Sequence, residues 1–189
     1  MSNESFKVWG ICGSLRQKSL NMMALKVAGE LMPQGMSLQI THYEDLPMYN
    51  FDVQSKGFPA ASERLKAEIL AADALLFASP EYNFSVGAPL KNVIDWMSRY
   101  QPVPFFGKPA AMISATTGPL GGARMQYDLR KIVGGLGAQF LGKPEVFIGM
   151  ANKKFDEEGR LNDETTRKFL TDQMLAFKDW IPRVKRAFA

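Results

Sequence analysis

Short apolar segments alternate with amphipathic segments along this chain of 189 residues, and this alternation constrains the fold more than any other feature. Apolar runs of this kind, separated by stretches with helical spacing, predict parallel strands joined by crossover helices on both faces of a sheet. We expect strands at 7–12, 37–43, 74–78, 109–114, 139–141 and 145–148, and helices at 21–32, 59–72, 87–100, 122–136 and 163–188, where Pro182 favours a kink. The length suits one α/β domain over residues 1–189.

The content of reactive side chains excludes several classes of protein. The single cysteine, Cys12, rules out a disulfide framework, and with one histidine, His42, the chain has no cluster for a metal site. No apolar run reaches the length of a membrane span, and the first residues lack the apolar stretch of a signal peptide, so we expect a cytoplasmic protein without a membrane partner. The net charge of +4 is spread along the chain, so we expect no nucleic-acid partner.

Three loops follow the first, third and fourth expected strands, at residues 13–21, 79–87 and 114–124. The carboxyl ends of parallel strands meet at one edge of the sheet, and ligands of such folds bind there, at a topological switch point. We therefore predict the functional site at these loops.

The first loop has the composition of an anion site. It combines a turn glycine with Ser14, Arg16, Ser19 and Asn21 just where a helix is expected to begin. Backbone N–H groups at a helix N-terminus favour a phosphate, and an arginine adds charge-assisted bonds. The alternative is an ordinary strand-to-helix turn with Ser19 as the N-cap.

Cys12 precedes this loop, so a thiol phosphatase is a second alternative. Such enzymes resemble a C-x5-R pattern, but here the last position is Lys18 and Arg16 comes too early. The cysteine is better interpreted as a small buried residue.

The other two loops suit a flat ligand. Tyr82 and Asn83 offer an aromatic face and an amide between prolines and a glycine, although a rigid loop with a helix cap would have the same composition. The third loop, rich in Ser, Thr and Gly, is a weak signal alone. Together, a phosphate site at one end and a planar-ring site at the other describe FMN.

Two long motifs resemble a known family. The segments GSLRQKSLN at 13–21 and PEYNFSVGAPLKNVIDW at 80–96, with GGAR at 121–124, resemble the NADPH-dependent FMN reductases of flavodoxin-like fold. The most similar branch contains bacterial quinone, chromate and azo-dye reductases, and the likeness covers nearly the whole chain. It implies a three-layer sandwich around a five-stranded parallel sheet in the order 2-1-3-4-5.

The resemblance also implies a set of site residues. Catalysis would be centred on the flavin, with no catalytic side chain and no metal, and Glu81 would be structural. Arg124 would contact the nicotinamide nucleotide or a neighbouring subunit, or would be a surface arginine at a helix start. The residues implied for the phosphate are Ser14, Arg16, Ser19 and Asn21; those for the flavin ring are Pro80, Glu81, Tyr82, Asn83 and Ser85; and those completing the site are Ser114, Thr116, Gly118 and Gly121.

The implied activity is a ping-pong hydride transfer from NADPH or NADH, through N5 of bound FMN, to small-molecule acceptors. These would be quinones and, promiscuously, chromate or other metal ions, azo or nitro compounds. Members of the family are typically homodimers or homotetramers. The alternative is a flavodoxin-type electron carrier without NAD(P)H turnover, but such carriers are usually acidic and this chain has a pI of about 9.2.

Overall fold

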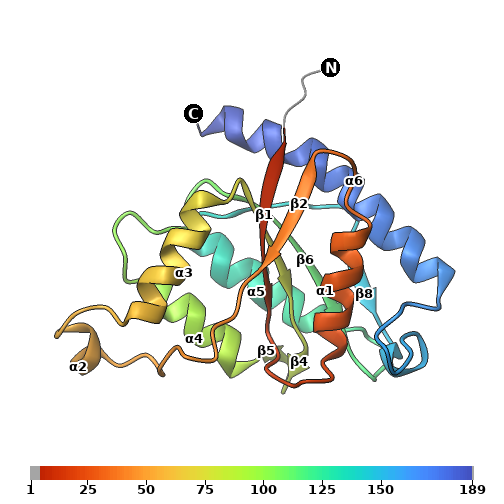
Figure 1. Ribbon diagram of the computed structural model, residues 1–189, viewed down its shortest axis with the longest axis horizontal. Coiled ribbons are helices and arrows are strands. Elements are labelled where there is room, and N and C mark those ends of the chain that lie inside the picture. The colour runs from red at the N-terminus through yellow and green to blue at the C-terminus, as the bar shows by residue number, and fades with distance from the viewer. Residues whose placement is uncertain (1–4, 189) are drawn as a thin grey trace.

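The computed structural model describes residues 5–188, which form a parallel sheet with helices on both faces (Figure 1). The strand order is β2-β1-β3-β6, with β7 and β8 both beside β6, and every pair is parallel. A separate antiparallel hairpin, β4–β5, follows β3. The strands are β1 (Phe6–Cys12), β2 (Met36–Ile40), β3 (Ala74–Ala78), β4 (Glu81–Tyr82), β5 (Ser85–Val86), β6 (Pro109–Ala115), β7 (Gln139–Phe140) and β8 (Val146–Ile148).

The predicted strand order 2-1-3-4-5 is confirmed, but the predicted count of five is wrong because the sheet has six strands. Two short strands share the fifth position: β7 pairs with the start of β6, at Pro109 and Ala110, and β8 with its end, from Ile113 to Ala115. Pro144 lies between β7 and β8 and has no N–H to donate, so one continuous ladder cannot form there.

The helices occupy the predicted places. Pro182 lies inside α6 and does not end it. The short helix α2, the 3₁₀ helix η1 and the hairpin β4–β5 were not predicted. None of the helices within residues 5–188 is long and apolar enough to cross a membrane. The helices are α1 (Leu20–Glu30), α2 (Phe51–Gln54), α3 (Ala60–Ala71), α4 (Ala88–Met97), α5 (Ala123–Gly135), η1 (Ala151–Lys153) and α6 (Glu164–Ala187).

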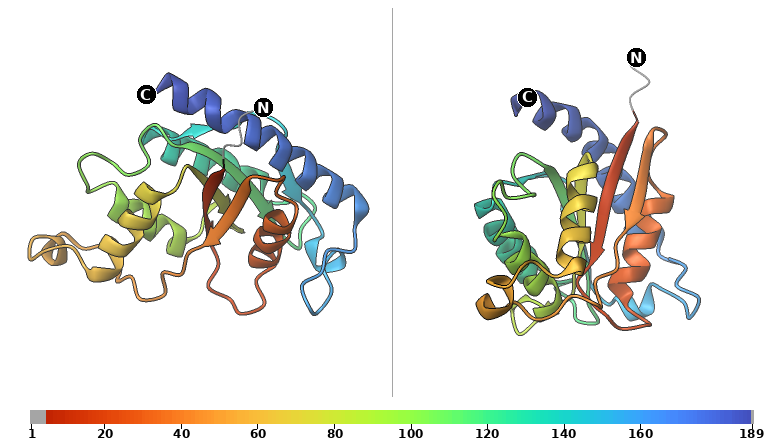
Figure 2. Two further views of the ribbon diagram at one scale, coloured as in Figure 1. Left: turned by 45° about the horizontal axis from the view of Figure 1, so that its top comes forward. Right: turned by 60° about the vertical axis from the view of Figure 1, so that its left-hand side comes forward.

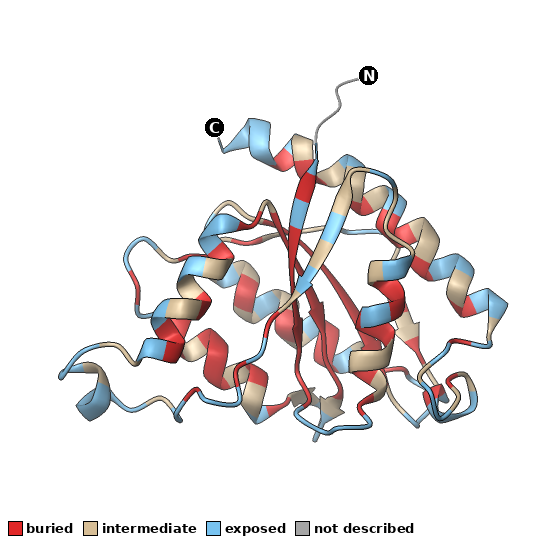
Figure 3. Ribbon diagram, viewed as in Figure 1, coloured by how far each residue is buried: buried red, intermediate tan, exposed pale blue. Residues whose placement is uncertain are grey.

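Helices cover both faces of the sheet (Figure 2), and an apolar cluster on each face holds the layers together. The first packs Trp9 and Phe77 against α3, α4 and α5, and the second packs Val8 and Leu76 against α1 and α6. Strands β3 and β6 are buried along their whole length (Figure 3). This explains why both appear in the sequence as continuous apolar runs.

Candidate functional site

A cavity of about 130 Å³ lies at the carboxyl edge of the sheet, where β1, β3 and β6 end. All three predicted loops contribute to it, and we call it the edge cavity. Its lining brings together eight of the predicted site residues and three that were not predicted. They are Ser14, Arg16, Ser19, Asn21, Pro80, Glu81, Tyr82 and Thr116, with Leu20, Ala115 and Thr117 in addition.

The first loop has hydrogen-bond donors next to the residues that line the cavity. The backbone N–H groups of Leu15 and Gln17 have no acceptor among residues 5–188, and the hydroxyl of Ser19 caps α1 by accepting from the N–H of Met22 at 3.3 Å. Arg16 is the only cation in the lining, and its side chain is exposed. Such donors at the N-terminus of an 11-residue helix, next to a guanidinium, favour an anion.

Asn21 lines the cavity, but its side chain is committed to the protein. The amide nitrogen donates to the carbonyl of Ala115 at 2.8 Å, and the amide oxygen accepts from the N–H of Ala115 at 2.9 Å. The residue is 3% exposed. Asn21 therefore joins the start of α1 to the end of β6, and this arrangement leaves little of its amide for a phosphate.

The second loop is the hairpin β4–β5, closed by Asn83 and Phe84. Both closing residues have positive φ, 48° and 70°, a conformation that two-residue hairpin turns require and that a bulky residue such as phenylalanine rarely adopts. The turn leaves both side chains exposed, so Asn83 lies outside the lining. Ser85 also lies outside it, and its hydroxyl helps to hold the pKa of Asp128 below the usual range.

An ion pair ties this hairpin to α5. The guanidinium of Arg124 donates from Nε to Glu81 Oε1 at 2.6 Å, and its Nη2 forms an ion pair with the same oxygen at 2.5 Å, while Glu81 Oε2 accepts from the N–H of Met125 at 3.4 Å. The same guanidinium lies 3.8 Å from the centre of the Phe84 ring. Arg124 thus neutralises the only acid in the cavity lining and covers the strained turn residue.

The third loop is fixed by bonds within the chain. The hydroxyl of Ser114 donates to the carbonyl of Gly121 at 2.5 Å and accepts from the amide nitrogen of Gln126 at 2.7 Å. Gly121 has φ of +61°, and a Cβ there would lie 2.6 Å from the carbonyl carbon of Phe147, so only glycine fits. These bonds fix the conformation of the third loop.

Three predicted residues of this loop, Ser114, Gly118 and Gly121, are therefore near the cavity without lining it. Thr117 was missed although it repeats the hydroxyl of Thr116 one position on. Ala115 and Leu20 carry no polar side chain, so the sequence held no signal for them.

The cysteine has no access to a substrate. Cys12 is 2% exposed, its thiol lies 3.4 Å from the carbonyl oxygen of Ser14 and 3.6 Å from the hydroxyl of Ser19, and burial raises its pKa. A phosphatase nucleophile needs a lowered pKa and exposure. The geometry therefore favours the interpretation of Cys12 as a buried structural residue.

Comparison with known proteins identifies the family. Residues 6–153 match the family described as NADPH-dependent FMN reductase. The chain belongs to this family. It is accordingly a flavin-dependent oxidoreductase with FMN as cofactor and NAD(P)H as co-substrate, as predicted.

Individual relatives match the chain over nearly its whole length. An NAD(P)H-dependent FMN reductase of Pseudomonas aeruginosa is 47% identical, with 97% of this chain and 99% of the relative covered. A quinone reductase of Escherichia coli is 40% identical with the same coverage. Among solved structures, the NAD(P)H:(acceptor) oxidoreductase FerB of Paracoccus denitrificans superimposes with a TM-score of 0.86 at 36% identity, covering 94% of this chain and 98% of that one.

The edge cavity has the properties that the phosphate end of FMN requires. The free N–H groups of the first loop and the charge of Arg16 suit a phosphate, and the only acid of the lining, Glu81, is paired with Arg124. The loops also pack closely: a Cβ at Gly13 would lie 2.3 Å from the hydroxyl oxygen of Ser79. The residues present therefore fit the cofactor of the family.

Proposed function

We propose that this protein transfers electrons from NAD(P)H to quinones, with FMN bound at the edge cavity and its phosphate end inside it. The observation that carries the proposal is the position and lining of the cavity. It lies at the switch point of the sheet, Arg16 is the only cation of its lining, and the adjoining N–H groups of Leu15 and Gln17 have no acceptor among residues 5–188. The names of two relatives support it, the quinone reductase of Escherichia coli and the NAD(P)H:(acceptor) oxidoreductase of Paracoccus denitrificans.

The residue roles follow from position. Ser14, Arg16 and Ser19 would hold the phosphate, while Pro80 and Tyr82 would border the flavin ring and Thr116 would complete the site. The other predicted residues would act by shaping the loops: Asn21 through Ala115, Glu81 through Arg124, Asn83 and Ser85 through the hairpin, and Ser114, Gly118 and Gly121 through the third loop.

Bound FMN supplies the redox chemistry, because it accepts hydride from NAD(P)H and passes the electrons to an acceptor. The side chains of the cavity bind and orient. Glu81 is the only carboxylate among the lining residues, and it is paired with Arg124.

We further propose that NAD(P)H and the acceptor use the same exposed face in turn, which gives ping-pong kinetics. A site without specific acceptor contacts would also reduce chromate and other metal ions, azo compounds and nitro compounds. Parallel lines in double-reciprocal plots of initial rates at several quinone concentrations are the expected result, and intersecting lines would contradict it.

The assembly we propose is a homodimer or homotetramer. Met48 and Phe51, which are 70% and 67% exposed around α2, offer an apolar contact surface. In Figure 1, α2 projects from the body of the molecule at the left. Sedimentation velocity should give a mass of two or four chains, and a monomer at micromolar concentration would contradict this part.

The decisive experiment is a visible spectrum of FMN-supplemented, desalted protein during anaerobic titration with NADPH and with NADH. The expected result is a retained flavin band that bleaches with the nicotinamide and returns on addition of a quinone. A retained band that does not bleach would favour the electron carrier. Loss of the flavin on desalting would contradict the assignment of the edge cavity.

A further inference from the structure

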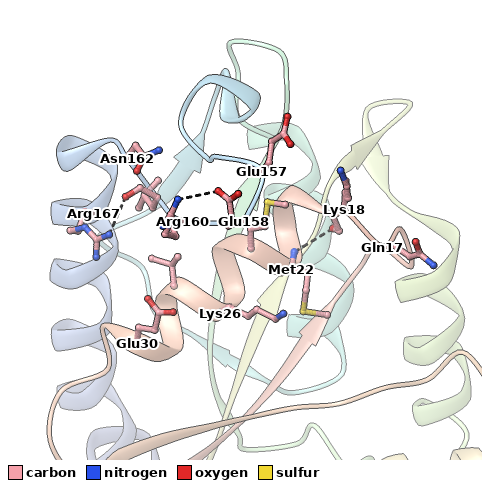
Figure 4. A pocket seen from close by; sticks show the side chains of 15 residues that line it. Gln17, Lys18, Met22, Lys26, Glu30, Glu157, Glu158, Arg160, Asn162 and Arg167 are labelled. Carbon is pink, nitrogen blue, oxygen red and sulfur yellow. Dashed lines mark hydrogen bonds and ion pairs between the residues drawn. The ribbon is translucent and has the colours of Figure 1, made fainter.

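A second cavity lies outside the site described so far. It is a groove of about 590 Å³ between α1 and the segment that leads into α6 (Figure 4). It begins at Gln17, Lys18 and Ser19 of the first loop, and Ser19 also lines the edge cavity. The two cavities therefore lie on two flanks of the same helix N-terminus.

The floor of this groove is apolar and adaptable. Met22, Met23 and Val27 of α1 face Gly159 and Leu161 across it. The turn at Gly159, with φ of +85°, lies directly against Met23, because a Cβ there would be 3.1 Å from Met23 Cγ. Thioether side chains make favourable contacts with flat aromatic rings and fill irregular space.

The rim carries charges of both signs. Arg160 is committed to Asp156 and Glu158, with bonds of 2.7 and 3.0 Å, and Arg167 donates to the carbonyl of Leu161 at 3.0 Å. Figure 4 shows Arg160 and Arg167 on the side of α6 and Lys18 at the end formed by the first loop.

The remaining rim charges are free to meet a ligand. Lys18, Lys26, Glu30 and Glu157 line the groove, and none of them forms an ion pair with another of the described residues. Carboxylates would repel a simple anion, and lysines a simple cation. A suitable ligand carries a phosphate for the lysines, N–H and O–H donors for the carboxylates, and a flat ring for the apolar floor.

We propose that this groove is a subsite for an adenylate, the adenosine 5′-phosphate half of a dinucleotide. Lys18 and Lys26 would neutralise its phosphate, the methionines would contact the adenine, and the carboxylates would accept from the ribose hydroxyls and the adenine amino group. The volume lies within the range of about 300 to 1,000 Å³ that is usual for ligand sites. The proposal rests on FMN binding in the edge cavity.

Two molecules contain this half. FAD is FMN extended at its phosphate, so with that phosphate in the edge cavity its adenylate would continue past Ser19 into the groove. NAD(P)H brings an adenylate joined to the nicotinamide nucleotide. The chemistry is shared, and the experiment separates the two sources.

The test compares Lys26→Glu with a control of equal charge change, Lys56→Glu, whose residue is exposed and lines neither cavity. Flavin fluorescence gives the Kd of the apoprotein for FMN and for FAD. Stopped-flow reduction of the FMN-loaded protein compares NADH and NADPH with reduced nicotinamide mononucleotide, which lacks the adenylate.

Loss of a charged contact to the phosphate predicts an effect of about tenfold. A tenfold rise in the Kd for FAD with that for FMN unchanged assigns the groove to FAD. A tenfold rise in the half-saturating concentration of NAD(P)H, with the mononucleotide unchanged, assigns it to the co-substrate. The proposal would be overturned if the Kd values for FAD and FMN changed equally and the half-saturating concentrations of NAD(P)H and the mononucleotide also changed equally. It would likewise be overturned if none of these values changed more than in the control variant.

A second measurement on the unaltered protein needs no variant. Free adenosine 5′-phosphate should compete with FAD or with NAD(P)H, but neither with FMN nor with the mononucleotide. Absence of competition at millimolar concentration would overturn the adenylate subsite. Failure to bind FMN or to be reduced by NAD(P)H would instead contradict the proposed function, so the two failures are distinguishable.

Discussion

The edge cavity and the groove share one serine and differ in almost everything else. The edge cavity is formed by main-chain donors and short side chains, held by bonds between loops such as those of Asn21 to Ala115. The groove is lined by lysines, glutamates and methionines, most of which have no fixed partner. A phosphate site made of backbone has one geometry, whereas a surface of long side chains adjusts to its ligand.

Helix α1 produces this difference through its periodicity. Leu20 and Asn21 point to the edge cavity, while Met22, Met23 and Lys26 point to the groove. Residues three and four apart share a face of a helix, so a change on one flank leaves the other flank in place. The following experiments, from the largest expected effect to the smallest, test whether the rigidity of the edge cavity is what distinguishes it.

Gly121→Ala should be the most damaging substitution. Its positive φ and the backbone of residues 147–149 leave no room for a Cβ, so we expect the free energy of unfolding to fall by about 3 kcal/mol and FMN retention to be lost. The matched control is Gly118→Ala, since φ there is ordinary and no atom lies within 4 Å of the added Cβ. Urea unfolding measures both, and equal stability of the two variants would contradict the rigidity of the third loop.

Asn21→Ala removes the bonds that join the first and third loops. The N–H and carbonyl of Ala115 would lose their partners in a buried place, so we expect a loss of about 2 kcal/mol in the free energy of unfolding. Asn21→Asp should recover little of this unfolding free energy, because a carboxylate accepts from the N–H of Ala115 but repels its carbonyl oxygen. If Asn21→Ala has the unfolding free energy of the wild type and only its FMN affinity is lower, then Asn21 is a phosphate ligand and not a structural link between α1 and β6.

Arg16→Ala should weaken FMN without affecting the fold. The side chain is exposed, and we expect a Kd about thirtyfold higher, the equivalent of a charge-assisted bond of roughly 2 kcal/mol. Arg183→Ala, at an exposed position of α6, controls for net charge. Flavin fluorescence titration gives both constants, and unchanged affinity in a folded Arg16 variant would remove this residue from the phosphate site.

Asp73 lies at the opposite edge of the sheet and should have the smallest effect. Burial raises the pKa of its carboxyl, but hydrogen bonds from Lys185 and from the N–H of Lys7 outweigh this and leave the pKa lowered. A lowered pKa in the folded state stabilises the protein above the unfolded-state pKa of about 3.9, and this stability is lost as the pH falls through the folded-state pKa.

Asp73→Asn should therefore cost about 0.5–1 kcal/mol at pH 7 and progressively less below pH of about 4. Urea unfolding at several pH values measures this difference, and FMN affinity should not change. A cost that is independent of pH would contradict the assignment to the ionised carboxylate.

The sequence predicted the architecture because the central strands are buried on both faces. Strands β3 and β6 leave continuous apolar runs, and the topology then places three loops at one edge. The hairpin β4–β5 was not predictable, because its turn has Asn83 followed by Phe84 instead of the usual asparagine and glycine. Arg124 lies over the ring of Phe84, whose φ is positive.

Residue type predicted where the site lies better than what each side chain does. Asn21 and Ser114 have the polar groups expected for ligand contacts, but their bonds go to Ala115 and to Gly121, so they support the site from within the protein. Such partners, 94 residues away in the first case, are a product of the tertiary fold and leave no local pattern.

The bond between Asn21 and Ala115 also gives this protein an internal reporter. The amide proton of Ala115 is held by a side-chain oxygen from another element, so its exchange with solvent deuterium measures how often α1 and β6 separate at their ends. Anything that locks the two loops together would slow that single proton. The NMR resonance of this amide proton therefore reports the opening and closing of the edge cavity, independently of the absorbance of the flavin.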